Sequence, residues 1–156
     1  MTTALADGLA ALHRRGYVHG DVKPSNIGFT ADGAPKLLDF GLARAADDAT
    51  VAGGTLRYLS PEVLCGRPAD AADDVWSLCV VLYEIATGEH PFAGGGVERV
   101  ADRIRHRRLR PSAPSPGGSE EPPVTAFAAS VLTGQRSARP ATATAFIAAL
   151  AVACRR

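Results

Sequence analysis

The pattern of hydrophobic and polar positions predicts a mainly helical chain. A leucine stripe at helical spacing runs through residues 2–15, and Gly16 directly after it is typical of a helix end. Residues 73–86 are apolar on nearly all sides, which indicates a central helix buried among other elements. The same kind of spacing predicts two final helices, over residues 124–132 and 141–154.

A further helix is expected after the glycine run 94–96, which itself fits a flexible loop. The apolar face of this helix holds Val97, Val100, Ala101 and Ile104. Its other faces carry the arginines Arg99, Arg103, Arg105, Arg107 and Arg108. A nucleic-acid-binding helix is one interpretation of these arginines. The formal net charge of the chain is only +1, which favours a solvated helix face or a protein docking surface, and no nucleic-acid partner.

Between residues 26 and 39 the pattern changes to that of a β-hairpin. Residues 27–29 and 36–38 are short apolar runs, and residues 30–34 between them have the composition of a tight turn. Antiparallel pairing brings the start of the first strand beside the end of the second. We therefore expect Asn26 and Asp39 to lie close together.

These two residues belong to a group of polar and charged side chains. Asp21, Lys23 and Asn26 lie within six residues of one another, and Asp39 joins them through the hairpin. Carboxylate and amide oxygens suit Mg²⁺, the lysine suits a phosphate, and a second carboxylate suits an attacking hydroxyl group. The combination predicts phosphoryl transfer with magnesium.

The composition of the chain bears on its domain count, its redox environment and its location. The chain has 156 residues, of which 46% are hydrophobic, enough for one domain with a real core. Its three cysteines are odd in number and lack ligand spacing, so we expect no disulfide framework and a cytoplasmic location. No apolar window is long enough to span a bilayer, and the first residues lack the pattern of a signal peptide. We expect no membrane association.

The sequence resembles the C-terminal lobe of a eukaryotic-type serine/threonine protein kinase of the bacterial kind. The motifs that carry the resemblance follow one another in the order of the family. They are His19-Gly20-Asp21-Val22-Lys23-Pro24-Ser25-Asn26, Asp39-Phe40-Gly41, Thr55-Leu56-Arg57-Tyr58, Ser60-Pro61-Glu62, Asp74-Val75-Trp76 and Arg139-Pro140. The resemblance implies a mainly α (α+β) large lobe, in which short β-hairpins carry the catalytic loop and the Asp-Phe-Gly motif.

The resemblance covers nearly the whole chain, so residues 1–156 are interpreted as the C-lobe portion of a protein kinase catalytic domain. The family's small N-terminal lobe is expected to be absent, because the sequence holds no G-x-G-x-x-G-x-V loop and no V-A-x-K strand. The chain is thus predicted to be truncated at its N-terminus, inside the helix that leads into the catalytic loop.

The resemblance also implies roles for single residues. Asp21 and Lys23 would be catalytic, and Lys23 would also contact ATP. Asn26 and Asp39 would hold Mg²⁺ and the nucleotide. The supporting residues implied by the family are His19 under the loop, Thr55 bridging Asp21 and Lys23, Asp74 reaching backbone amides of the loop, and Glu62 paired with Arg139.

The sequence departs from the family at three places. Gly20 replaces the usual arginine, which makes activation by loop phosphorylation doubtful because glycine cannot hold a phosphate. Gly28 replaces a larger apolar residue below the adenine, and roughly 1.5–3 kcal/mol of apolar contact is lost if nothing else fills the space. Gln135-Arg136 stands where the family has Asp-Pro, an exchange whose effect the sequence does not reveal.

Two functions remain open. By resemblance, the chain is the catalytic half of a serine/threonine kinase that transfers the γ-phosphoryl group of ATP to Ser or Thr hydroxyls of a protein substrate. The alternative is a non-catalytic kinase-lobe module that binds or scaffolds other proteins. Without a small lobe, Phe29 and Phe40 would leave an exposed apolar inter-lobe surface, so we expect self-association or binding of a partner there.

Overall fold

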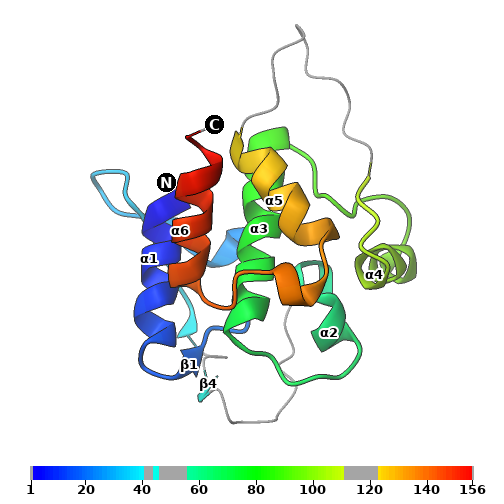
Figure 1. The fold of residues 1–156 in the computed structure, drawn as a ribbon, viewed down its shortest axis with the longest axis horizontal. Helices are drawn as coiled ribbons and strands as arrows, with labels where there is room; N and C mark the ends of the chain where they lie inside the picture. Colours follow the sequence, from blue (N-terminus) through cyan, green and yellow to red (C-terminus); the bar gives the residue numbers. More distant parts are fainter. Residues whose placement is uncertain (1, 41–43, 46–55, 111–122, 156) are drawn as a thin grey trace, which may run out of the picture.

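The computed structural model describes residues 2–40, 44–45, 56–110 and 123–155. Four long helices dominate it, as the hydrophobic pattern predicted (Figure 1). They are α1 (Thr2–His13), α3 (Ala71–Thr87), α5 (Pro123–Thr133) and α6 (Ala143–Ala153). The mainly helical fold class is therefore confirmed, and each helix lies within three residues of its predicted bounds.

Helix α3 occupies the centre of the molecule, with α1 and α6 on one side and α5 packed along it (Figure 1). Every residue from Ala72 to Tyr83 is buried. Asp70 is the N-cap, and it forms a capping box in which its side chain accepts from Ala72 N while the side chain of Asp73 accepts from Asp70 N. The helix ends at Gly88, whose φ of 73° is a left-handed conformation that glycine adopts without strain.

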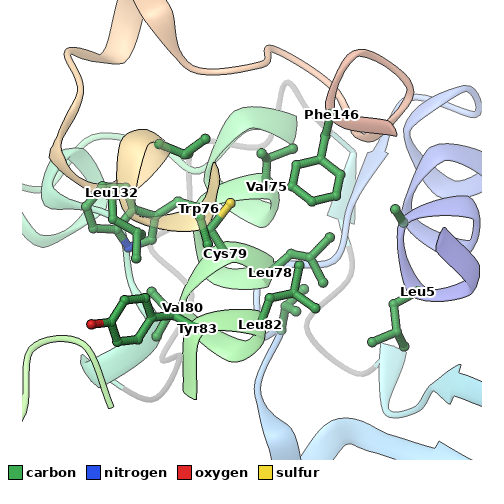
Figure 2. Packing of buried hydrophobic residues seen from close by; sticks show 14 of the residues in the cluster. Leu5, Val75, Trp76, Leu78, Cys79, Val80, Leu82, Tyr83, Leu132 and Phe146 are labelled. Carbon is green, nitrogen blue, oxygen red and sulfur yellow. The ribbon is translucent and has the colours of Figure 1, made fainter. Parts of the chain in front are cut away.

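The hydrophobic core forms where the other helices meet α3. Val75, Leu78 and Cys79 of α3 lie with Leu5 of α1 and Phe146 of α6 in one cluster (Figure 2). On another side, Trp76 stacks on Phe92, with ring centroids 5.7 Å apart. Burying each large apolar side chain stabilises the fold by roughly 1.5–3 kcal/mol. The well-packed helix α3 therefore gives the neighbouring loops a rigid support.

Two small antiparallel sheets lie beside the helices. The predicted hairpin is present: β2 (Ile27–Phe29) pairs with β3 (Pro35–Leu37), with Ile27 opposite Leu37. Its second strand begins and ends one residue earlier than the apolar run indicated. The pairing of β1 (Tyr17–Val18) with β4 (Arg44–Ala45) was not predicted, because a two-residue strand leaves no periodic pattern.

Shorter elements complete the fold. They are η1 (Pro24–Asn26), η3 (Leu56–Tyr58), α2 (Pro61–Leu64), α4 (Val97–Arg105) and η4 (Arg136–Ala138). In α2 the N-cap Ser60 accepts a hydrogen bond from Val63 N at 3.2 Å. No helix among the described residues combines the length and the hydrophobicity needed to cross a bilayer.

The predicted helix after the glycine run corresponds to α4, with two corrections. Val100, Ala101 and Ile104 face the core, but Val97 is 61% exposed because it is the first residue of the helix. Arg107 does not lie on a solvated helix face. It follows the end of the helix and has a φ of 51°. Its side chain forms an ion pair with Glu62.

Candidate functional site

The loop from residue 19 to residue 26 is held from below by Asp74 on α3. One carboxylate oxygen of Asp74 accepts from His19 N at 2.8 Å and the other accepts from Gly20 N at 2.9 Å. The predicted contact between Asp74 and backbone amides of this loop is therefore present. Gly20 has a φ of 76°, a backbone conformation that residues other than glycine rarely adopt.

His19 fixes the inside of the loop. Its side chain is fully buried, its Nε2 donates to Leu38 O at 3.3 Å, and its Nδ1 accepts from Asp21 N at 3.3 Å. These two bonds define which ring nitrogen carries the proton. Because Leu38 ends the hairpin and Asp21 lies in the loop, the ring of His19 joins the two segments that carry the candidate site.

Asp21, Lys23 and Asn26 form one polar cluster. Asn26 donates its side-chain amide to Asp21 O at 2.8 Å and to Asp21 Oδ2 at 2.9 Å. Lys23 Nζ lies 2.7 Å from the same Oδ2. A carboxylate oxygen held between an amide and an ammonium group is fixed in one orientation.

Asp39 lies at the end of the hairpin that starts at Asn26. Leu38 N donates to Asn26 O at 2.8 Å, so Asp39 follows directly on the residue that pairs with Asn26. Asp39 has a left-handed φ of 57° and an exposed side chain. A left-handed non-glycine residue is strained and is frequent at functional sites. Phe40 comes next, and its ring packs on His19 with centroids 5.2 Å apart.

The side chains of Asn26 and Asp39 carry oxygen atoms of the kind that bind a magnesium ion. Because the amide nitrogen of Asn26 is used toward Asp21, its Oδ1 is the atom suited to a cation, and Asp39 adds carboxylate oxygens. These are hard ligands of the type that Mg²⁺ prefers. The described residues contain no cluster of three or more His, Cys, Asp or Glu side chains suited to a metal. A metal held here would therefore need further ligands from phosphates or water.

The pair Glu62–Arg139, expected from the sequence, lies at the start of α2 and after η4. Arg139 Nη2 is 3.1 Å from Glu62 Oε2, and the side chain of Arg139 is fully buried. The guanidinium group of Arg139 also lies over the ring of Trp76, 4.7 Å from its centroid. The pair thus ties the segment that precedes α2 to the core around α3.

Sequence reasoning missed the rest of this ion network. Arg136 contacts Asp73 at 2.9 Å, Asp70 at 2.5 Å and Glu62 at 3.6 Å. Arg107 contacts Glu62 at 2.9 Å. The departure from the family at Gln135-Arg136 therefore places a cation among three carboxylates. The cluster joins segments far apart in sequence, so periodicity offered no signal for it.

The network shifts the pKa values of its carboxyl groups in opposite directions. Burial acts to raise the pKa of Glu62, but the charge of Arg139 and its hydrogen bonds outweigh it and hold that pKa below the ordinary value. Burial dominates at Asp73 and raises its pKa, although Ser60 donates a hydrogen bond to it. At Asp70 burial again acts to raise the pKa, but Arg136 and Arg67 outweigh it, so the fold stabilises the charges of Glu62 and Asp70.

The short helix η3 is held in place by hydrogen bonds to α3. Ser77 Oγ donates to Tyr58 O at 2.7 Å, and Tyr58 Oη donates to Glu84 Oε2 at 2.8 Å. Burial and the neighbouring carboxylate of Glu84 raise the pKa of Tyr58, so this phenol stays protonated. Thr55, expected to bridge Asp21 and Lys23, lies outside the described residues, as does Gly41.

Comparison with known proteins assigns this arrangement to a family. The protein kinase domain family matches residues 1–149. A probable serine/threonine-protein kinase of Corynebacterium efficiens is 43% identical over 126 residues, which cover 76% of this chain and 19% of the relative. Serine/threonine-protein kinase PknB of Mycobacterium leprae is 47% identical over 120 residues, 71% of this chain and 19% of the relative.

PknB of Mycobacterium tuberculosis is 43% identical over 128 residues, 75% of this chain and 20% of the relative. The chain thus spans about a fifth of the length of the curated relatives that it matches. The expected resemblance is confirmed by both kinds of comparison. With its loop, hairpin and buried helix in the order of that family, the chain belongs to the protein kinase domain family.

Proposed function

We propose that this chain provides the large-lobe part of a serine/threonine protein kinase that transfers the γ-phosphoryl group of ATP to protein hydroxyls. The observation that carries the proposal is the Asp21 carboxylate, held by Asn26 and Lys23 beside the end of the hairpin that bears Asp39. The relatives named above are serine/threonine kinases, which supports the same class of acceptor.

Asp21 acts on the acceptor hydroxyl group in this proposal. Asn26 and Lys23 fix its Oδ2 at 2.9 and 2.7 Å, so the carboxylate is oriented before a substrate arrives. It accepts a hydrogen bond from the hydroxyl, aims the oxygen at the phosphorus and takes the proton late in the transfer. Preorganised positioning of this kind accounts for most catalysis in phosphoryl transfer.

Lys23 and the pair Asn26 and Asp39 act on the phosphate end. Lys23 brings a positive charge 2.7 Å from Asp21, at the place where charge moves between acceptor and phosphoryl group. The oxygens of Asn26 and Asp39 would hold Mg²⁺, which when bound neutralises charge on the nucleotide phosphates. Asp74 and His19 keep the loop of residues 19–26 and the end of the hairpin in place.

A second candidate function is favoured by the exposed apolar residues of the hairpin region. Phe29 is 64% exposed, Phe40 54% and Leu38 47%. Exposed large apolar side chains are suited to the apolar part of a protein-binding surface. A non-catalytic module that docks a partner, or a second copy of this chain, through these residues would use the same fold without transferring phosphate.

Calorimetric titration of the purified chain with Mg-ADP tests the nucleotide part of the proposal. Binding that disappears when Mg²⁺ is omitted, and that is strongly weakened in Asp39→Ala and Asn26→Ala, is the expected result. Arg14→Ala, at an exposed residue next to the end of α1, is the matched control and should bind like the wild type. Binding that is identical in all variants would contradict the proposal and favour the docking module.

A further inference from the structure

His90 joins the short helix η3 to the loop that follows α3. Its Nε2 donates to Arg57 O at 3.1 Å, and its Nδ1 accepts from Phe92 N at 3.2 Å. A carbonyl oxygen can only accept a hydrogen bond and a backbone N–H can only donate one, so the two partners fix the neutral ring with its proton on Nε2. The residue is only 6% exposed, so water offers little to replace either bond.

The ring of His90 also belongs to a row of packed aromatic rings. It lies edge-on to Tyr58 of η3, with ring centroids 5.4 Å apart, and it contacts Phe92 with centroids 6.1 Å apart. Phe92 in turn stacks on Trp76 in the core. A movement of His90 would therefore change both the support of η3 and the surroundings of Trp76, which is the only tryptophan of the chain.

Helix η3 is connected to the candidate site through the residues that follow it. Leu59 and Ser60 line one small cavity together with Gly20 of the loop of residues 19–26 and with Asp74, which holds that loop. The position of η3 therefore bears on the packing beneath the loop.

The surroundings of His90 disfavour a second proton on its ring. The charged and titratable groups that adjoin the ring or its loop are Glu84 of α3, Arg57 and Tyr58 of η3, and Glu89 with its partner Arg110. Burial is the largest influence and lowers the pKa of His90 below its usual 6.5. Glu84 opposes this shift, but its carboxylate already accepts a hydrogen bond from Tyr58 Oη.

Protonation would break the arrangement at Nδ1. The added proton can only go to this nitrogen, where it meets the N–H of Phe92, and two donors cannot bond one another. A charged ring without a partner is costly in a buried position, so it has to move out. Because the fold lowers the pKa of His90, the stabilisation is complete above pH 6.5 and is lost as the pH falls through the lowered pKa.

We propose that His90 is a pH-sensitive anchor of η3: the neutral ring ties Arg57 to Phe92, and protonation of Nδ1 displaces the ring and releases η3. The proton comes from solvent, and apart from the new N–H bond only hydrogen bonds change. Mild acid thereby loosens the segment that packs beneath the loop of residues 19–26. The anchor works whether or not the chain transfers phosphate, so it is independent of the proposed function.

Hydrogen exchange at the amide of Leu59, which donates to Leu56 O within η3, tests the proposal. The protection factor of this amide, corrected for the intrinsic effect of pH on exchange, is measured from about pH 7.5 to about pH 5.5. In the wild type it should fall about threefold or more over this range. In His90→Gln, whose side chain can donate to Arg57 O and takes up no proton, it should stay nearly constant.

The matched control is His106→Gln, at an exposed histidine directly after α4, and it should show the same fall in protection as the wild type. A protection factor that is constant in the wild type would overturn the proposal. So would an equal fall in the wild type and in His90→Gln.

Two readouts on the wild type do not depend on a variant that folds. NMR of the ring nitrogens should place the proton of neutral His90 on Nε2 and give a pKa below 6.5. A neutral ring protonated on Nδ1, or a pKa above 6.5, would overturn the proposal. The fluorescence of Trp76 should change over the same pH range as the protection of Leu59, and a constant spectrum would show that the ring stays in place and would equally overturn it.

Discussion

His13 Nε2 lies 2.9 Å from Asp74 Oδ2, so the end of α1 is bonded to the first turn of α3 at the point where α3 holds the loop of residues 19–26. On its other side, His13 Nδ1 accepts from Ala143 N, the first residue of α6, at 3.3 Å. Asp74 in turn accepts from His19 N and Gly20 N. Three helices and the loop are therefore joined through one buried carboxylate.

Replacing Asp74 by alanine should destabilise the protein strongly. Three donors would lose their acceptor, and an unsatisfied group that is buried, as the His19 amide is, costs about 1–3 kcal/mol. Asp74→Asn keeps one acceptor oxygen and should cost clearly less. Urea unfolding gives both values, and hydrogen exchange at the amides of His19 and Gly20 localises the effect. An alanine variant as stable as the wild type would contradict the role of this carboxylate.

Arg139→Ala should lower the free energy of unfolding by less than the roughly 3–5 kcal/mol that a buried charge without any partner costs, because Glu62 loses Arg139 but keeps Arg107 and Arg136. The packing of the guanidinium group on Trp76 is lost as well. Arg14→Ala, at an exposed position, is the control and should change stability by less than about 0.5 kcal/mol. Chemical unfolding of the two variants side by side measures the difference.

The ion network also predicts a pH dependence. The pKa of Glu62 is lowered in the folded chain, so its charge stabilises the fold above the ordinary glutamate pKa of 4.5. This contribution should be lost as the pH falls below 4.5 and passes through the lowered pKa. Urea unfolding of wild type and Glu62→Gln between neutral and acid pH should therefore show a stability difference that shrinks toward acid. A difference that is constant with pH would contradict the assignment.

The elements with regular patterns could be predicted from the sequence, and the contacts between distant segments could not. Helix α3 was predicted because its apolar residues continue over four turns, and the hairpin because a turn separates two short apolar runs. The N-cap of α3 was not predicted, because Asp70 lies before the apolar stretch. It forms a capping box with Asp73. The pairing of β1 with β4 depends on tertiary packing alone.

The same distinction holds within the candidate site. Asp74 and the pair Glu62–Arg139 were predicted from family motifs, and both contacts are present. Arg136 was only a departure of unknown effect, because its three carboxylate partners come from two other segments of the chain. Leu38 was not singled out either. Its side chain lies over Gly28, where an added Cβ would be 2.7 Å from Leu38 Cδ1, and a linear pattern does not show such a contact.

Exposed apolar side chains near the site predict association. Phe29 and Phe40 are more than half exposed, as we expected from the sequence. We predict that the purified chain self-associates or aggregates, and that Phe29→Ser reduces this by removing the most exposed of these residues. Light scattering at increasing concentration measures both proteins. A wild type that stays a monodisperse monomer would contradict the prediction and favour a self-sufficient module.

The role of Asp21 in phosphoryl transfer is the central claim, and an assay of γ-phosphoryl transfer from Mg-ATP to a serine- and threonine-rich protein tests it most directly. By themselves these 156 residues should have little activity, because they contain no G-x-G-x-x-G-x-V loop to hold the phosphates. The assay is therefore run with and without the separately purified small lobe of a related kinase. We predict that the small lobe restores transfer to the wild type, and that Asp21→Asn is roughly a hundredfold slower or more. Equal rates in wild type and Asp21→Asn would contradict the account.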